Sequence, residues 1–498
     1  MTTSAPSASR TARSSRQTAP GPADYELIIV GGGPAGLAAA EFAARLGVRV
    51  ALVERAALGG CSLNSRSIPS KALLRSARLF ASVHDARRLR TAGHREAPAN
   101  LNLVMRRVGA TRTRVARYNS VERLRSIGVA VLFGEATFSS QLSVVIGGET
   151  LRFDSALVAT GARSAPFAIA GVSYDAFLTN ETIFGLKELP ARLAVVGGGP
   201  QGCELAQAFC RLGSWVTITQ DEAKCLPREE RDAAQLLADS MARDGVDLPL
   251  NTSVVAIRRE GNLTYFDTAS NGVRGQVIAD LVLVSVGRIP NLDGLGLDAA
   301  RIAVRDDEGI RVDDFLQSTN PRIYAAGDVC MQHKFTHVAE STARLAIDNM
   351  FRGARRRHTD LTIPSCTYCD PEIAHVGLQV WDARAQAIPV KTFTVMMQDV
   401  DRAVTDRQDR GFVKLHFREG SDTIIGATIV VSRASEVTNE MSVAIGSGIG
   451  LRNLASIFHT YPTQSDAIRM AAMDLVSQDA AGTAPTAANP GSAGWRVW

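Results

Sequence analysis

The sequence predicts an α/β fold with two Rossmann-like dinucleotide-binding domains, followed by a smaller α+β domain. Three observations predict it. A glycine-rich turn at 31–36 follows a short apolar strand, and a second turn with the same spacing at 197–202 follows another. From about residue 361 the pattern changes to alternating strands and then helices. At 498 residues, the chain is long enough for two or three domains.

The first predicted unit opens with an apolar strand over 26–30. Gly31, Gly33 and Gly36 follow directly and begin an Ala-rich helix. Glycine permits the tight turn and a close approach of backbone to pyrophosphate, while the helix N-terminus offers N–H groups to the anion. The next strand ends at Glu54, 21 residues past Gly33, where a carboxylate can accept hydrogen bonds from ribose hydroxyls.

The same unit is repeated further along the chain. A strand over 193–196 precedes Gly197, Gly199 and Gly202, and the following strand leads to Gln220, again 21 residues past the middle glycine. One glycine-rich turn alone is a weak signal. Two copies in the same register and strand context predict two dinucleotides in one chain.

Other apolar segments end in turns where an open α/β sheet binds its ligands, at the carboxyl ends of its strands. Three such segments end at Thr160 and Gly161, at Gly287, and at Asp328. Residues 75–128 carry many arginines at helical spacing and predict two long exposed helices.

Composition excludes several classes of protein. The net charge is +5, but Arg10, Arg13, Arg16 and Arg496 lie in acid-free terminal stretches, so the rest of the chain is close to neutral and predicts no nucleic-acid partner. No apolar run is long enough to cross a membrane. The seven cysteines do not form a secreted disulfide framework, and no metal-ligand cluster stands out. The acid-free N-terminus resembles a transit peptide in composition, but a plain disordered tail and a cytoplasmic protein are favoured.

The segment Gly59–Lys71 reads Gly-Gly-Cys-Ser-Leu-Asn-Ser-Arg-Ser-Ile-Pro-Ser-Lys. It resembles the redox-disulfide segment of the class I pyridine nucleotide-disulfide oxidoreductases, in which the pattern is Gly-Gly-x-Cys-x-Asn-x-Gly-Cys-x-Pro-Ser-Lys. Here Ser62 and Ser67 stand at both cysteine positions, and Arg66 replaces a glycine. A serine hydroxyl cannot form a disulfide and lacks the thiolate that carries thiol–disulfide exchange.

The resemblance runs from about residue 24 to 475 and is greatest to the mercuric-reductase-like branch, on the segments 179–184, 202–207 and 368–374. It implies FAD at the first glycine turn and NAD(P)H at the second. The implied domains are an FAD-binding domain over 24–165 and 287–358, an NAD(P)-binding domain over 166–286 and a dimerisation domain over 359–478, between disordered tails at 1–23 and 479–498.

Site residues follow from matching positions in the family's pattern. The implied FAD-binding residues are Gly31, Gly33, Gly36, Glu54, Lys71, Ala136, Thr160, Gly161 and Asp328. The implied NAD(P)-binding residues are Gly197, Gly199, Gly202, Gln220 and Gly287. Lys71 matches the lysine beside flavin N5, and Glu204 matches its ion-pair partner. Because Gln220 is neutral and Asp221 would repel a 2′-phosphate, NADH is favoured over NADPH.

The family's C-terminal motif, His-x-His-Pro-Thr-x-x-Glu, is also altered. Tyr461 replaces the histidine that serves as acid–base catalyst, and Asp466 replaces the glutamate that orients it. Tyrosine, with a pKa near 10, is a poor general base at neutral pH. Mercuric ion reduction requires a terminal cysteine pair in this family, and the chain ends Gly494–Trp498 without one.

The sequence therefore predicts a homodimeric FAD-dependent NAD(P)H oxidoreductase that passes hydride to flavin and electrons on to a small-molecule acceptor, without a dithiol relay. Two alternatives stay open. One is a non-catalytic FAD-binding sensor or assembly protein, suggested by Arg66 and Gln220. The other is residual disulfide reduction through Cys61, the one cysteine that the resemblance places near the flavin.

Overall fold

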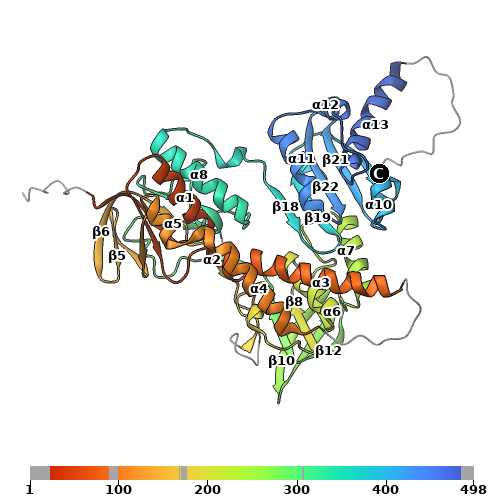
Figure 1. Cartoon of the computed structure of the whole chain (residues 1–498), viewed down its shortest axis with the longest axis horizontal. Coiled ribbons are helices and arrows are strands. Elements are labelled where there is room, and N and C mark those ends of the chain that lie inside the picture. Colours follow the sequence, from red (N-terminus) through yellow and green to blue (C-terminus); the bar gives the residue numbers. More distant parts are fainter. Residues whose placement is uncertain (1–22, 89–98, 168, 170–175, 306–307, 484–498) are drawn as a thin grey trace, which may run out of the picture.

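The computed structural model describes residues 23–88, 99–167, 169, 176–305 and 308–483. The tails predicted over 1–23 and 479–498 lie outside the described residues, except for Ala23 and for residues 479–483, which continue the helix α13 (Asp466–Thr483) instead of beginning a disordered tail. The described chain is a mixed α/β structure with three groups of strands, each accompanied by its own helices (Figure 1).

The first group is a seven-stranded sheet in the order β3-β2-β1-β6-β5-β4, with β17 also paired to β6. Leu27, Ile28 and Ile29 are fully buried, as expected for parallel strands that are covered on both faces. Helices α1 and α8 lie side by side on one face and share one apolar core (Figure 1). The elements are β1 (Tyr25–Val30), α1 (Pro34–Arg45), β2 (Val50–Glu54), α5 (Val121–Ser126), β3 (Ala130–Phe133), β4 (Ala136–Ser140), β5 (Ser143–Ile146), β6 (Glu149–Val158), β17 (Ile323–Ala325) and α8 (Thr336–Arg352).

The second group repeats the parallel arrangement on a smaller scale. Its three-stranded parallel sheet has the order β13-β8-β9, and an antiparallel meander of β10, β11 and β12 lies beside it. The α6 helix ends at Gly213, whose φ of 113° lies in the left-handed region that favours glycine. The elements are β8 (Arg192–Val196), α6 (Pro200–Leu212), β9 (Trp215–Thr219), α7 (Arg231–Asp244), β10 (Thr252–Glu260), β11 (Leu263–Ser270), β12 (Val273–Ala279) and β13 (Leu281–Val284).

Two helices predicted to be exposed are instead half-buried. Helices α3 (Ser67–Arg88) and α4 (Leu101–Ala116) follow the short α2 (Gly60–Asn64) and pack against α6 (Figure 1). Leu101, Val104 and Val108 form an apolar stripe at helical spacing and are buried in the core that includes Phe209 of α6. The exposed arginines lie on the other faces of these helices, and their number concealed the apolar stripe.

The third group is a five-stranded antiparallel sheet in the order β18-β19-β22-β21-β20, which has its own apolar core. Its elements are β18 (Pro364–Thr367), β19 (Glu372–Gly377), α9 (Val380–Ala385), β20 (Val390–Met396), α10 (Asp401–Thr405), β21 (Phe412–Arg418), β22 (Ile424–Val431), α11 (Ala434–Gly446), α12 (Leu451–Ser456) and α13 (Asp466–Thr483). Short two-stranded ladders elsewhere pair β7 (Ala162–Ser164) with β14 (Arg288–Pro290), and β15 (Val304–Arg305) with β16 (Gly309–Ile310).

A buried polar cluster joins the second and third groups. Lys414 Nζ of β21 lies 2.6 Å from Glu230 Oε2, and His416 Nε2, on a fully buried side chain, lies 3.2 Å from Glu230 Oε1. Burial opposes ionisation of Glu230, but the adjacent His416 and the charge of Lys414 prevail and lower the pKa of Glu230 to about 2. Burial and the adjacent Glu230 charge raise the pKa of Glu229 to about 7.

We predict that Gly202→Ala destabilises the second group. An added Cβ would lie 2.1 Å from the Gly197 carbonyl oxygen, so the helix would have to move away from the strand, at a cost of about 3 kcal/mol. Thermal unfolding followed by circular dichroism measures the change. Gly109→Ala in α4 is the control, because its Cβ meets nothing within 4 Å and should raise helix stability slightly. Equal midpoints for the two variants would contradict this account.

Glu229 gives a pH-dependent prediction. Because its pKa is raised in the folded chain, the unfolded chain loses the proton first, and stability falls as pH rises from about 4.5 to 7. Glu229→Gln should therefore match the native protein at pH 4 and exceed it at pH 8 by up to about 3 kcal/mol. Unfolding midpoints at both pH values test this. Exposed Glu222→Gln should show no such difference, and a Glu229→Gln gain that is equal at both pH values would refute the assignment.

Candidate active site

The first glycine turn holds α1 against β1 at a distance that only glycine allows. Gly31 has a φ of 110°, and an added Cβ would lie 2.4 Å from the Ala159 carbonyl oxygen. A Cβ on Gly36 would lie 1.8 Å from the Gly31 carbonyl oxygen. The helix therefore begins directly over the end of the strand.

The second turn has the same geometry. Gly197 has a φ of 102°, and its added Cβ would lie 2.5 Å from the Ser285 carbonyl oxygen. Gly199 has open space around its Cβ position, while a Cβ on Gly202 would meet the Gly197 carbonyl oxygen. Gly287 follows β13 at the same edge, with a φ of 128°. The repeat seen in the sequence is thus a repeat in three dimensions.

Both turns are closed by a side chain at the end of the next strand. Glu54 accepts hydrogen bonds from the backbone N–H of Gly32 at 2.7 Å and of Ala56 at 2.8 Å. Gln220 Oε1 accepts one from the Gly198 N–H at 2.6 Å. Both side chains are buried. An amide oxygen therefore does at the second turn what a carboxylate does at the first.

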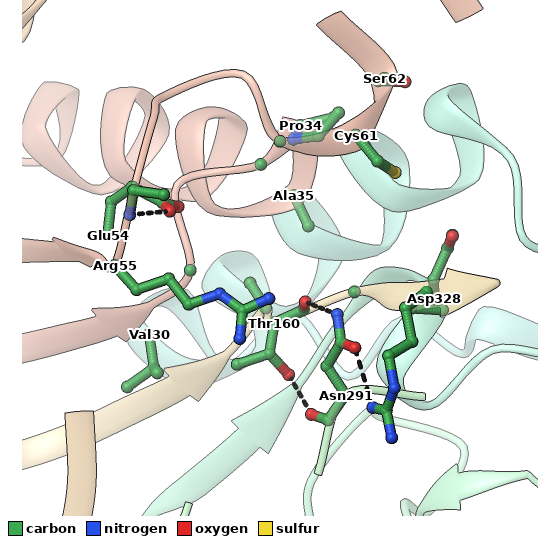
Figure 2. Close-up of a pocket in the computed structure, with 18 of the residues that line it drawn as sticks. Val30, Pro34, Ala35, Glu54, Arg55, Cys61, Ser62, Thr160, Asn291 and Asp328 are labelled. Atoms are coloured by element: carbon green, nitrogen blue, oxygen red, sulfur yellow. Dashed lines mark hydrogen bonds between the residues drawn. The ribbon is translucent and has the colours of Figure 1, made fainter. Parts of the chain in front are cut away.

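A cavity of about 470 Å³ opens beside the first turn (Figure 2). Predicted FAD-binding residues that line it are Gly31, Gly33, Glu54, Ala136, Thr160, Gly161 and Asp328. Gly161, with a φ of 72°, has nothing within 4 Å of its Cβ position, so a side chain there would project into open space. At Gly161 the wall of the cavity is therefore bare backbone, which fits the close approach of a dinucleotide. Gly36 and Lys71 are not among the lining residues. Gly36 packs the helix on the strand, and Lys71 lies farther along α3.

Asn291, which the sequence analysis did not single out as a site residue, braces one wall of this cavity. Its Nδ2 donates to the Thr160 carbonyl oxygen at 2.9 Å, and Thr160 Oγ1 donates to the Asn291 carbonyl oxygen at 2.8 Å (Figure 2). Arg163 Nη1 donates to Asn291 Oδ1 at 3.1 Å. The turn after Gly287, noted in the sequence, was the available signal.

Three hydroxyls gather where α2, α3 and α8 begin or end. The Oγ atoms of Ser62 and Ser67 lie 3.2 Å apart. Thr336 Oγ1, on the first residue of α8, is in hydrogen-bond contact with Ser62 and lies 3.2 Å from Ser67 Oγ. Ser62 and Thr336 line the cavity. The sequence contained no signal for Thr336, because its partners are more than 260 residues away in the chain.

The predicted pair of Lys71 and Glu204 is present. Lys71 Nζ lies 2.9 and 3.1 Å from the two carboxylate oxygens of Glu204. The backbone N–H of Tyr368 donates to Glu204 Oε1 at 2.9 Å, and its ring lies under Lys71 Nζ, 4.1 Å from the centroid. Burial raises the pKa of Tyr368, so its phenol stays neutral. Three distant segments meet at this carboxylate.

Positive charge collects around Asp328 at one end of the cavity. Arg66 Nη1 lies 3.6 Å and Arg288 Nε 3.7 Å from Asp328 Oδ2. Lys334 Nζ donates to the Asp328 carbonyl oxygen at 2.9 Å. Arg288 Nη2 also donates to Cys61 Sγ at 3.3 Å. Asp328 was predicted, whereas this ring of cations was not.

The C-terminal motif is arranged differently from the expectation. Tyr461 Oη donates to Asp401 Oδ2 at 2.6 Å, and this hydrogen bond raises the pKa of Tyr461. Asp466 pairs with Arg469 at 2.7 Å, so it does not orient Tyr461 as the matching glutamate was expected to do. His459 Nε2 lies 2.7 Å from Glu440 Oε1. Tyr461 is 68% exposed, and it lies outside the cavity on this chain.

The described ranges contain neither a metal centre nor a membrane-spanning helix. No group of three or more His, Cys, Asp and Glu residues there could hold a metal ion. No described helix is long and apolar enough to cross a bilayer. All seven cysteines are free thiols.

Known proteins resemble this chain over nearly its whole described length. A mercuric reductase from Streptomyces lividans is 32% identical over 464 residues, 91% of this chain and 96% of its own length. A dihydrolipoyl dehydrogenase from Thermus scotoductus is 31% identical over 459 residues, 91% of this chain and 98% of its own.

Solved structures of similar proteins share the fold of this chain over most of its length. LpdA from Mycobacterium tuberculosis has a TM-score of 0.82 at 28% identity, covering 90% of this chain and 99% of that one. The HOCl-induced flavoprotein disulfide reductase RclA from Escherichia coli has a TM-score of 0.80 at 26% identity, with the same coverage. The predicted fold class is confirmed.

The family profile described as pyridine nucleotide-disulphide oxidoreductase matches residues 25–343, and the profile of its dimerisation domain matches 363–472. The dimerisation domain supports a homodimer. The chain therefore belongs to the pyridine nucleotide-disulphide oxidoreductase family of flavin-dependent enzymes.

Proposed function

We propose that this protein is a cytoplasmic FAD-dependent NAD(P)H oxidoreductase whose electrons leave the flavin directly for a small acceptor, without a dithiol relay. The observation that carries the proposal is the contact of Ser62 Oγ and Ser67 Oγ at 3.2 Å, where the family resemblance places the redox-active cysteine pair. Two hydroxyls in that position hydrogen-bond to each other but cannot exchange electrons with a disulfide.

The cofactor positions follow from the two repeated turns. The backbone N–H groups behind Gly31 and Gly33 would bind the FAD pyrophosphate, with Glu54 near its ribose and Thr160, Gly161 and Asp328 at the flavin end. Ala136 lines the cavity and would meet the adenine through its backbone. FAD, when bound, supplies the capacity to accept a hydride and release its electrons.

The second turn would hold the pyridine nucleotide, with Gly197, Gly199 and Gly202 at its pyrophosphate. Gln220 is neutral and already bonded to the Gly198 N–H, and the exposed Asp221 beside it would repel a 2′-phosphate. These features favour NADH over NADPH.

Lys71 is the group that we assign to the flavin's reacting edge. Glu204 and the Tyr368 ring fix its ammonium in one place, so the charge is oriented before reaction rather than during it. A fixed cation at that edge would stabilise negative charge on the reduced flavin.

Tyr461 and Asp466 occupy the family's acid–base positions, and we propose that neither serves as a base. The pKa of Tyr461 is raised by its hydrogen bond to Asp401, and Asp466 is paired with Arg469. Loss of the base is consistent with loss of the thiols that it would serve.

One observation favours a second candidate, residual disulfide reduction through Cys61. This thiol lines the cavity and accepts a hydrogen bond from Arg288 Nη2 at 3.3 Å. Among the described residues, no other cysteine lines the cavity, so the second sulfur would have to come from the substrate or a partner.

Anaerobic titration with dithionite or NADH tests the main proposal. We expect full reduction at two electrons per bound FAD, with no thiolate-to-flavin charge-transfer band, because no described dithiol lies beside the cavity. The double variant Ser62→Cys with Ser67→Cys is the matched control and should take up four electrons. Uptake of four electrons by the native protein would refute the proposal. The variant Cys61→Ser tests the second candidate, because disulfide reduction through Cys61 would be lost with its thiol.

We further predict that Glu204→Gln slows reduction of the flavin by NADH about 100-fold, because Lys71 loses the carboxylate that fixes it. Stopped-flow absorbance at the flavin band measures the rate. Asp280→Asn is the control, since it also removes the carboxylate of an ion pair, with Arg192, but at a partly exposed site. If both variants reduce at the native rate, Lys71 has no role in hydride transfer.

A further inference from the structure

The cations around Asp328 outnumber the anions that face them. Arg66 and Arg288 share one carboxylate oxygen of Asp328, at 3.6 and 3.7 Å. Among the described residues, Lys334 Nζ donates to main-chain oxygens, those of Asp328 and Met331. The other nearby carboxylate, Glu204, is already paired with Lys71. We call Arg66, Arg288, Lys334 and Asp328 the cation cluster.

The charge of Arg288 is held away from water. The Arg288 side chain is 8% exposed, and its Nε and Nη1 are buried without a hydrogen-bond acceptor in the described part of the chain. Burial and the charge of Arg288 lower the pKa of Arg66, and burial lowers that of Lys334. Such an arrangement is unfavourable by itself and is relieved when a negative charge comes near.

A negatively charged group can approach these cations from the cavity. Arg66 and Asp328 both line it, together with Cys61, Ser62 and Thr336. In Figure 2, Asp328 lies on the opposite side of the view from Glu54, with Thr160 between them. Asp328, with Arg66 beside it, therefore lies at the end of the cavity that we assign to the flavin ring rather than to the adenosine, and Arg288 and Lys334 lie behind them.

Arg66 is held in place for this role. Its Nη1 donates to the Lys334 carbonyl oxygen at 2.8 Å, two residues before α8 begins. The family pattern has glycine here, which carries no charge. This guanidinium is therefore a feature of the present chain and not of the shared frame.

We infer that Arg66, together with Arg288 and Lys334, raises the reduction potential of the bound flavin by stabilising the added negative charge of its reduced form. The inference rests on the proposed function, which places FAD in this cavity. It also narrows the acceptor. A flavin of raised potential reduces disulfides unfavourably, since their potentials are low, and favours an acceptor of higher potential such as a quinone.

The test is the midpoint potential of the bound flavin, measured by slow anaerobic reduction against a reference dye. We expect Arg66→Gln and Arg66→Gly to weaken the reduced form about tenfold, which lowers the two-electron midpoint by about 30 mV. Arg66→Lys keeps the charge and should retain most of the potential. Flavin absorbance and a thermal midpoint establish that each variant is folded and loaded.

Arg112→Gln is the matched control. Its guanidinium touches the Asn64 carbonyl oxygen of the same segment at 3.5 Å but is exposed, so solvent screens it and the potential should not move. If Arg66→Gln does not hold flavin, Lys334→Gln removes a charge from the same cluster and should lower the potential in the same direction.

The outcomes distinguish failure of the inference about the flavin potential from failure of the proposed function. A loaded Arg66→Gln or Lys334→Gln protein with the native potential overturns the inference and leaves the proposed function standing. A native protein that binds no flavin overturns the proposed function itself. A fall in potential that Arg66→Lys restores supports the charge, and not the shape, of the side chain as the cause.

Discussion

Glu204 is buried, with 5% of the residue exposed. Its carboxylate accepts hydrogen bonds from two segments that are far from it in sequence. Lys71 reaches it from α3, and the Tyr368 backbone reaches it from the chain beside the third sheet, while Glu204 itself lies on α6. A buried charge of this kind is tolerated only when its partners are in place. The Glu204 carboxylate is therefore the point at which all three parts of the chain are held together beside the site.

The two dinucleotide units show how far the same geometry can diverge in chemistry. Both turns have a left-handed first glycine and a helix glycine packed against its carbonyl oxygen. Both receive an oxygen acceptor from the end of the next strand, yet one acceptor is charged Glu54 and the other is neutral Gln220. The close packing of the helix on the strand requires glycine at these positions. The hydrogen-bond acceptor at the end of the next strand can instead be either a carboxylate or an amide oxygen.

Short-range features of this molecule could be read from its sequence, and long-range ones could not. The glycine spacing and apolar strands predicted both units because each depends on a few neighbouring residues. Lys71 and Glu204 were found only through the family resemblance. Thr336 and Arg288 gave no local signal, since they meet Ser62 and Cys61 across more than 220 residues. The buried face of α4 was missed because its arginines outweighed three apolar residues.

Helix α3 begins at Ser67, beside the three hydroxyls, and its 22 residues correspond to a rod of about 33 Å. Its middle packs against α6, the helix that opens the second dinucleotide unit. One continuous helix therefore spans from the hydroxyl end of the first cavity to the helix that opens the second dinucleotide unit.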